Sequence, residues 1–423
     1  MFKLLAGEGY NLLPRMRIGG PTAAYVTSSP ALMATGPYSF LWDGAVSPAA
    51  RFSYASASPY FDFDMTAIVN YGQEDGTSSP WSGGGIAAAS DQKHTGTYAL
   101  KGTVSGAYGY VDIQVRPGEQ WQFIGWNRGD GQAAARFMLN ILDSGQYWNG
   151  TGWTTTLTVV GSNATTTWTQ YTATFTVPSF SELLRPLVTL RVYIFQSAVA
   201  GSTWYDDILL IPGVNLVAVL GHNVPSRAPV KATSWGGEAY QSGGTGTGTM
   251  TNFQPGVSAI VSSMVFARSW RVFFDDTVSN AGYAPRVGEI ILGQTVDLLK
   301  NPSFPIRFTA KEPGQIRNMT RDGAETVMNS ASRAAWSGLL SFQFAQASEY
   351  KQLRDALIYS GRSGGFPAVI IPTETDSDLL LFGHMSEQGT AFNRLGQNVR
   401  QAEFTFNEEV PATFLMSNPV TGT

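Results

Sequence analysis

The stretch "DQKHTGTYALKG", Asp91–Gly102, determines how the middle of this chain is interpreted. A Thr-Gly turn leads into a short run that favours a strand, because Tyr and Leu suit strands and Gly suits turns. Downstream, short segments of alternating apolar and polar residues follow one another, with Gly, Asn, Asp and Pro clusters between them. Strands at this spacing predict a β-sandwich or jelly roll. The segments are "YGYVDIQV" (Tyr108–Val115), "ARFMLNIL" (Ala135–Leu142), "TTLTVVG" (Thr155–Gly161), "WTQYTATFTV" (Trp168–Val177) and "LVTLRVYIF" (Leu187–Phe195).

Sequence patterns divide the chain into four regions. Residues 1–68 and 213–308 contain strand-like runs, and in "PYFDFDMT" (Pro59–Thr66) apolar and acidic residues alternate as in a half-buried strand. Residues 69–212 hold the predicted jelly roll. Residues 309–423 combine further strand-like runs with one expected helix, Ser348–Gly361, which has an N-cap serine and a terminal glycine. We therefore expect a mainly β chain with a small C-terminal α+β, barrel-like module.

Composition excludes several classes of protein. Only 14% of the 423 residues are charged, and the net charge is −4, so a general attraction to nucleic acid is not expected. Cysteine is absent, which excludes disulfides and thiolate metal sites. The first 20 residues lack the apolar core of a signal peptide, and no apolar run reaches the about 20 residues that span a bilayer. We expect no cleaved export signal and no membrane insertion.

An ordered set of motifs in residues 69–212 resembles the carbohydrate-binding-module-like jelly rolls found in xylanases and many phage structural proteins. The set begins with "NYGQEDGTSSPW" (Asn70–Trp81) and "TGTYALK" (Thr95–Lys101), and continues with "VRPG" (Val115–Gly118). It ends with Trp168–Val177 and "WYDDILL" (Trp204–Leu210). The opening strand departs from the family where Tyr71, Gly72 and Gln73 replace its usual residues. The resemblance covers about one third of the chain and implies a jelly-roll fold with a sugar-binding function.

Sugar binding requires exposed aromatic faces with polar side chains between them. The loop "GQYWNGTGW" (Gly145–Trp153) offers Tyr147, Trp148 and Trp153, and Trp126 is a further candidate. For the loop aromatics, a sugar surface, a protein interface and simple burial stay open. Trp121 and Trp168 are expected to alternate inward and form the core.

The same resemblance implies a structural calcium ion held by one carboxylate near the opening strand and one near the closing strand. The matching residues are Glu74 and Asp207. Calcium prefers several oxygen ligands, so the alternative for these two residues is a solvated strand end and turn. No other cofactor is expected.

The flanking regions resemble structural proteins of tailed-bacteriophage tails and baseplates. The segment "SPYFDFDM" (Ser58–Met65) resembles the discoidin-like strand that leads directly into a strand such as "VNLVAVLGHN" (Val214–Asn223), here about 150 residues later. Ser269–Gly293 and the module ending at Phe404–Phe414 resemble recurrent parts of those proteins. The resemblance implies a jelly roll inserted into a discoidin-like sandwich, in a homo-oligomeric ring that joins other tail or baseplate proteins. The protein would assemble in the host cytoplasm, become part of the virion and contact host cell-surface polysaccharide.

Catalytic signatures are scarce, and we expect no enzyme. His94, His222 and His384 lie far apart in sequence and show no metal-binding spacing. The acidic pairs Asp206/Asp207, Asp275/Asp276 and Glu408/Glu409 are adjacent residues, which point to opposite faces of a strand, whereas a glycosidase needs two facing carboxylates. The alternative function is a secreted or surface glycan-processing enzyme with an accessory binding module.

Overall fold

In the part of the chain that the computed structural model describes, the elements are β-strands, which confirms the prediction of a mainly β chain. No helix in this described part of the chain is long and apolar enough to cross a membrane. The structure describes residues 3–6, 12–13, 26–29, 50–52, 58–68, 75–178, 187–224, 229–235, 248–254, 257–275, 286–297, 307–311, 315–319, 325–329, 335–344, 366–371, 381–394 and 400–408.

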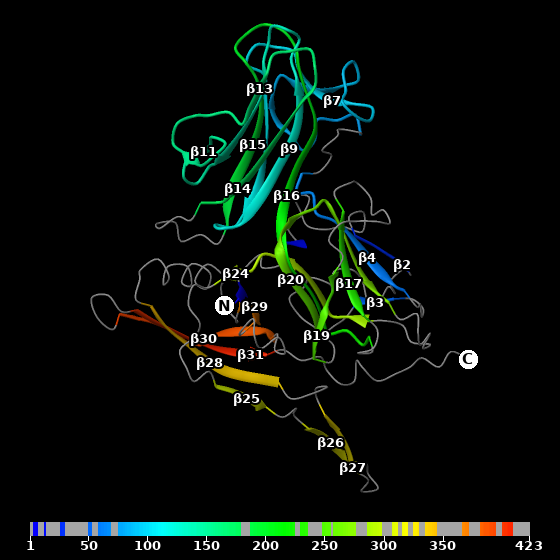
Figure 1. The fold of residues 1–423 in the computed structure, drawn as a ribbon, viewed down its shortest axis with the longest axis vertical. Coiled ribbons are helices and arrows are strands. Elements are labelled where there is room, and N and C mark those ends of the chain that lie inside the picture. The colour runs from blue at the N-terminus through cyan, green and yellow to red at the C-terminus, as the bar shows by residue number, and fades with distance from the viewer. Residues whose placement is uncertain are drawn as a thin grey trace.

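The insert is a sandwich of two antiparallel sheets and lies at the top of Figure 1. One sheet, called the β15 sheet, has the order β12-β11-β10-β15-β8-β5, with β13 beside β10. Its strands are β5 (Ser82–Gly84), β8 (Tyr108–Val115), β10 (Ala135–Ile141), β11 (Gln146–Trp148), β12 (Trp153–Thr154), β13 (Gly161–Asn163) and β15 (Val188–Gln196). The other, called the β9 sheet, contains β6 (Ile86–Ala89), β7 (Ala99–Gly102), β9 (Gln120–Arg128), β14 (Thr169–Thr176) and β16 (Thr203–Leu220).

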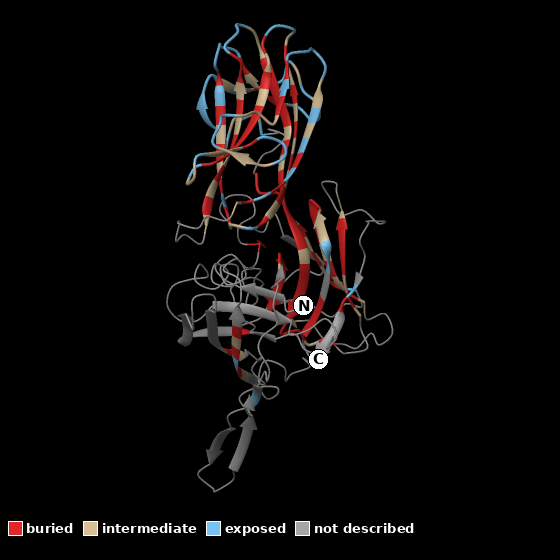
Figure 2. Ribbon diagram, turned by 60° about the vertical axis from the view of Figure 1, so that its left-hand side comes forward, coloured by how far each residue is buried: buried red, intermediate tan, exposed pale blue. Residues whose placement is uncertain are grey.

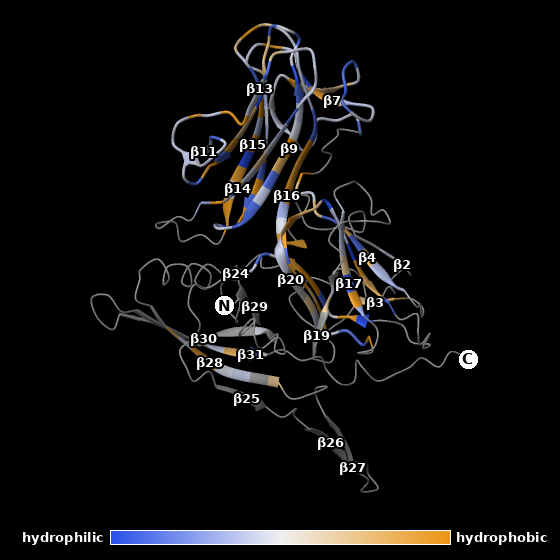
Figure 3. Ribbon diagram, viewed as in Figure 1, coloured by the Kyte–Doolittle hydropathy of each residue, from blue (hydrophilic) through white to orange (hydrophobic). Residues whose placement is uncertain are grey.

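Strict alternation of side chains forms the core between these two sheets. Every second residue of β9 and of β15 is buried, and Figure 3 shows the matching change of hydropathy along β15. Phe137 makes edge-to-face contacts with Phe123 and Tyr205, at centroid distances of 5.1 and 5.7 Å. Trp121, one of the two tryptophans expected in the core, is completely buried, and Trp168 is half-buried. Figure 2 shows the exposed residues of the insert concentrated in its loops and on its outer faces.

We call residues 69–212 the insert, and the part expected from residues 1–68 and 213–308 the scaffold. One strand, β16, belongs to both (Figure 1). Its first part pairs with β7 and β9, and its second part pairs with β20 (Val257–Phe266) and β23 (Glu289–Gly293). From the sequence, two strands were expected here, with a domain boundary after residue 212, and the structure joins them. The reason is the position of Pro212, which forms the last pair with β9, so its missing N–H falls where that ladder ends.

The scaffold contributes a second sheet with the order β18-β17-β21-β4-β2. Within β4 the predicted alternation is correct, since Phe61 and Phe63 are buried while Asp62 and Asp64 are half-buried. The strands are β2 (Val26–Ser29), β4 (Tyr60–Asp64), β17 (Val230–Trp235), β18 (Gly248–Thr249) and β21 (Ser269–Phe274), with β19 (Thr251–Gln254) beside β20 and a small pair of β3 (Ala50–Arg51) and β22 (Arg286–Val287).

The two ends of the insert meet at one place. The backbone N–H of Ala67 donates to the carbonyl of Leu210 at 2.9 Å, and Met65 donates to Arg268 at 2.6 Å. The chain therefore leaves and rejoins the scaffold at neighbouring points, as an insertion requires.

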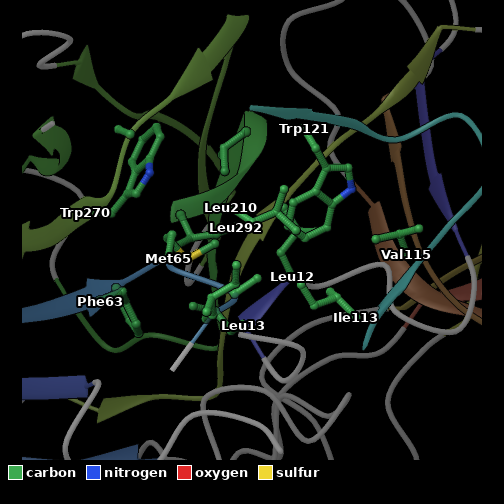
Figure 4. Packing of buried hydrophobic residues seen from close by; sticks show 14 of the residues in the cluster. Leu12, Leu13, Phe63, Met65, Ile113, Val115, Trp121, Leu210, Trp270 and Leu292 are labelled. Carbon is green, nitrogen blue, oxygen red and sulfur yellow. The ribbon is translucent and has the colours of Figure 1, made fainter. Parts of the chain in front are cut away.

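A continuous hydrophobic core crosses this junction. Figure 4 shows Leu12, Trp121, Leu210 and Leu292 close together, and all four are buried. The side chain of Gln294 continues the ladder of β9 beyond Pro212. Its Oε1 accepts from the N–H of Gln120, and its Nε2 donates to the carbonyl of the same residue, both at 2.8 Å. The insert is thus joined to the scaffold by packing and hydrogen bonds as well as by the chain.

The C-terminal strands form a seven-stranded sheet with the order β24-β1-β29-β30-β31-β28-β25. The first strand of the chain, β1, pairs with β29, although the sequence placed residues 1–68 with the scaffold. The expected helix Ser348–Gly361 lies outside the described residues. The strands are β1 (Lys3–Ala6), β24 (Val296–Asp297), β25 (Arg307–Lys311), β28 (Ala335–Phe344), β29 (Phe366–Ile371), β30 (Leu381–Arg394) and β31 (Arg400–Glu408), with a separate hairpin of β26 (Gln315–Met319) and β27 (Glu325–Asn329).

Candidate functional site

The outward face of the β15 sheet carries a group of aromatic and charged side chains that interact with one another. On β8, alternate residues from Gly109 to Val115 are buried, which directs Tyr110 and Asp112 outward. On β15, the same rule directs Arg191 and Tyr193 outward. Because the outward residues of neighbouring strands lie opposite one another, they form rows across the sheet.

One row crosses four strands. Tyr147 on β11 lies opposite Asn140 on β10, Asn140 lies opposite Arg191 on β15, and Arg191 lies opposite Asp112 on β8. The next row places Tyr193 opposite Tyr110. Their rings are 5.8 Å apart and tilted by 54°. We call the residues Tyr110, Asp112, Asn140, Tyr147, Arg191 and Tyr193 the insert platform.

Arg191 is the centre of the insert platform. Its Nε and Nη2 donate to the two carboxylate oxygens of Asp112 at 2.6 and 2.7 Å, a bidentate pair. The guanidinium also lies 3.8 Å from the ring centroid of Tyr110, and Nη1 donates to the hydroxyl of Tyr193 at 3.2 Å. The hydrogen bonds to Asp112 raise the pKa of Arg191 above its ordinary value. The group is fixed yet reachable, since the Arg191 and Asp112 side chains are 20% and 35% exposed.

This arrangement suits a ligand that has both apolar and hydroxyl-bearing surfaces. The tyrosine rings offer flat apolar area, while the guanidinium and carboxylate groups offer donors and acceptors at fixed positions. Asn140 is buried at 4% exposure and its Nδ2 donates to the carbonyl of Gln146, so it supports the row from below rather than offering a polar group to a ligand. Phe195 and Tyr108 form the next opposite pair on the same face, and the Tyr108 side chain is 46% exposed. Aromatic surface therefore continues along the sheet beyond Tyr110.

The predicted aromatics of the loop Gly145–Trp153 separate into two groups. Tyr147 belongs to the insert platform, as described. Trp148, the next residue of the strand, points to the opposite side and is 7% exposed. It packs against Trp153 and Phe175 at centroid distances of 5.5 and 5.9 Å. The expectation that Trp148 offers a surface to a ligand is therefore corrected.

Trp153 completes the same packing. It meets Phe175 edge to face at 5.6 Å, and its Nε1 donates to the carbonyl of Thr176 at 2.7 Å. Two indoles and a phenylalanine thus close one side of the sandwich core, with Trp153 half-buried. The physical reason is that burial of such large apolar side chains stabilises the fold more than exposure does. Trp153 therefore contributes to this packing, and its role in ligand binding stays a prediction.

Trp126 lies on the outward face of the other sheet, away from the insert platform. Its indole is covered by His94, whose ring is stacked on it with centroids 3.8 Å apart and planes 17° apart. His94 also meets Trp168 edge to face at 5.8 Å. The structure therefore does not bring Trp126 together with Tyr147.

Two adjacent carboxylates hold the loop that carries His94. Asp206 is fully buried and accepts the backbone N–H groups of His94 and Thr95 at 2.8 and 3.2 Å. Asp207, at a bulge with φ of 47°, accepts from the Thr95 hydroxyl and from His94 Nδ1, each at 2.7 Å. Burial, and secondly the charge of Asp207, raise the pKa of Asp206 to about 6.

Of the two predicted calcium ligands, the structure describes only Asp207. Both oxygens of Asp207 already accept hydrogen bonds from protein groups, and Glu74 lies outside the described residues. Among the residues that are described, no group of three or more His, Asp or Glu side chains could hold a metal ion. Calcium at Glu74 and Asp207 therefore stays a prediction, and no functional step depends on it.

Sequence reasoning missed Tyr110, Asp112, Arg191 and Tyr193, although it identified both strands that carry them. The available signal was the polar half of the alternation, Tyr-x-Asp in one strand and Arg-x-Tyr in the other.

Comparison with known proteins agrees with the fold of the insert. Residues 66–194 match the sequence model of the family described as "Carbohydrate binding domain". The predicted carbohydrate-binding-module-like insert is therefore confirmed. No curated protein matches the chain.

Among solved structures, the CBM22-1 xylan-binding domain of Paenibacillus barcinonensis Xyn10C matches with 15% identity and a TM-score of 0.26, covering 34% of this chain and 91% of that one. TmCBM61, solved in complex with β-1,4-galactotriose, matches with 16% identity and a TM-score of 0.24, covering 35% and 98%. The tailspike protein 4 of bacteriophage CBA120 matches with 11% identity and a TM-score of 0.24, covering 35% and 21%.

Proposed function

We propose that this chain is a structural protein of a bacteriophage tail or baseplate whose insert binds saccharides through the insert platform. The proposal that the insert binds saccharides rests on one observation. Arg191 and Asp112 form a fixed group with Tyr110 and Tyr193 on the outward face of the β15 sheet. Its ligand is a saccharide chain of the host cell surface. The match of residues 66–194 to the carbohydrate-binding family supports this choice of ligand.

The assembly part of the proposal rests on the scaffold. The resemblance of Ser269–Gly293 and of the C-terminal strands to phage tail proteins supports a self-assembling ring that joins other tail or baseplate proteins in the virion. The insert projects from the scaffold in Figure 1, an arrangement suited to outward presentation. Analytical ultracentrifugation of the full chain tests self-assembly, and a single monomeric species would contradict it. Antibody labelling of virions tests the location.

The alternative of a glycan-processing enzyme has less support. The carboxylates of Asp206 and Asp207 are both used to hold the loop at His94 and Thr95, and Asp275 is paired with Lys231 at 2.8 Å. These groups serve structural roles in the described part of the chain. Release of reducing sugar from the polysaccharides tested below would favour the enzyme.

Titration of the full chain with bacterial surface polysaccharides, xylohexaose and β-1,4-galactotriose tests the binding site. We expect Tyr110→Ala and Tyr147→Ala each to weaken binding by about tenfold, equivalent to about 1.4 kcal/mol. Gln170→Ala is the matched control, because Gln170 is exposed on the other sheet of the insert. Equal affinity of the tyrosine variants and the control would refute the assignment of the platform.

A further inference from the structure

The scaffold repeats the arrangement of the insert platform on a different sheet. On β4, Tyr60 and Asp62 point outward, and on β21 so do Arg271 and Phe273. The register places Tyr60 opposite Phe273, and Asp62 opposite Arg271. In the insert, Tyr110 and Asp112 have the corresponding positions opposite Tyr193 and Arg191.

The geometry of the two groups agrees closely. Arg271 Nε and Nη2 donate to the two carboxylate oxygens of Asp62 at 2.6 and 2.7 Å, the same distances as in the pair of Arg191 and Asp112. The Arg271 guanidinium lies 3.8 Å from the centroid of Tyr60, again as in the insert. The two pairs lie in different parts of the chain and in different sheets.

The scaffold group is also accessible. The Arg271 and Asp62 side chains are 21% and 24% exposed, and Tyr60 and Phe273 are half-buried. Lys231 on β17 extends the group at one edge, with its Nζ 5.5 Å from the ring centroid of Phe273 and 2.8 Å from Asp275. The surface thus presents apolar rings beside fixed donors and acceptors.

The charges indicate what kind of ligand fits. Arg271 is neutralised by Asp62, Lys231 by Asp275 and Asp64 by Arg268, so the charges of these described residues balance. A phosphorylated or strongly acidic ligand would gain little here. An uncharged ligand with apolar faces and many hydroxyl groups can use both the rings and the paired polar groups.

We infer that the outward face of β4 and β21 is a second saccharide-binding platform, specific for neutral oligosaccharides. It lies in the scaffold, outside residues 66–194 that match the carbohydrate-binding family. The inference rests in part on the likeness to the insert platform. It depends on different residues, so the scaffold platform can prove not to bind while the insert platform does.

Three forms of the full chain, applied to an array of neutral oligosaccharides with phosphorylated ones as comparison, test this inference. The first form carries Tyr110→Ala and Arg191→Lys, which disable the insert platform and leave only scaffold binding. The second adds Tyr60→Ala, and the third adds Ser263→Ala instead, a change at an exposed scaffold residue. We expect residual binding to neutral sugars in the first and third forms, and at least tenfold weaker binding in the second.

The outcomes separate the two proposals. Residual binding that Tyr60→Ala leaves unchanged, or no residual binding in the first form while the wild type binds, would overturn the scaffold platform alone. No binding by the wild type would overturn both platforms. Arg271→Lys, which keeps the charge but loses the bidentate pair, is a second variant in case Tyr60→Ala unfolds the scaffold. It should also weaken residual binding about tenfold while its thermal unfolding stays close to that of the Ser263→Ala form.

Discussion

Replacement of Gln294 by methionine tests how the insert is fixed to the scaffold. Methionine keeps the length of the side chain and removes both of its hydrogen bonds to the backbone of Gln120. The position is 4% exposed, so water does not readily replace the lost partners. Two net hydrogen bonds contribute about 2 kcal/mol, and the unsatisfied buried N–H and C=O raise the expected cost to about 2–4 kcal/mol.

The assay is hydrogen exchange of the β9 segment in the full chain. A cost of about 2–4 kcal/mol on local opening corresponds to exchange that is roughly 30- to 700-fold faster at Gln120 and its neighbours. Exchange is preferable to global unfolding because a chain of several domains need not unfold in two states. Strand β15 pairs with β10 and β8 and not with the segment of Gln294, so its amide exchange should stay as slow as in the wild type.

Gln114→Met is the matched control. Gln114 is exposed and its Nε2 donates to the hydroxyl of Thr189 at 3.2 Å, so the same chemical change there should alter stability by less than about 0.5 kcal/mol. Exchange at Gln120 in Gln294→Met that matches the wild type would refute the reasoning. It would mean that hydrophobic packing around Trp121 fixes the junction without the Gln294 amide.

Two further predictions concern stability. Trp148→Ala should lower the free energy of opening of the insert by about 3 kcal/mol because the indole is buried, whereas Tyr147→Ala should cost less than about 1 kcal/mol. Hydrogen exchange of the β9 and β14 segments measures both, and equal losses would contradict the assignment of Trp148 to the core. The pKa of Asp206 is raised from 3.8 to about 6 by folding, so the folded state binds this proton more tightly, and stability should increase as pH falls from 7 through 6 toward 4. In Asp206→Asn that contribution should be missing, and identical pH profiles of the two proteins would exclude it.

Much of the fold could be predicted because the alternation is regular. In β9, β15 and β4, the apolar half of the pattern matches the buried residues directly. The strand β16 could not be predicted as one element, because Pro212 and Gly213 normally indicate a break. Only the register shows that Pro212 falls at the end of one ladder and that Gly213 begins the next.

The candidate site was harder to predict for a similar reason. In "QYW", three consecutive residues of one strand, the sequence does not show which neighbour faces the core, and Tyr147 and Trp148 take opposite sides. The outcome depends on Phe175, which is distant in sequence and completes the packing around Trp148. Likewise Asp112 and Arg191 are 79 residues apart, so their pairing exists only after the strands are aligned.

If the insert binds saccharide as proposed, the shared strand β16 favours binding because it removes a hinge between insert and scaffold. An insert attached only by two chain crossings could rotate, and a ligand would then have to compensate for the orientational freedom lost on binding. Here the 18 residues of β16 continue through the junction, and the Gln294 amide holds the adjacent strand β9. Arg191 is likewise held before any ligand arrives, by Asp112 and Tyr193. Both the insert and its central side chain are therefore preorganised, so contact with a saccharide needs little further ordering of the protein.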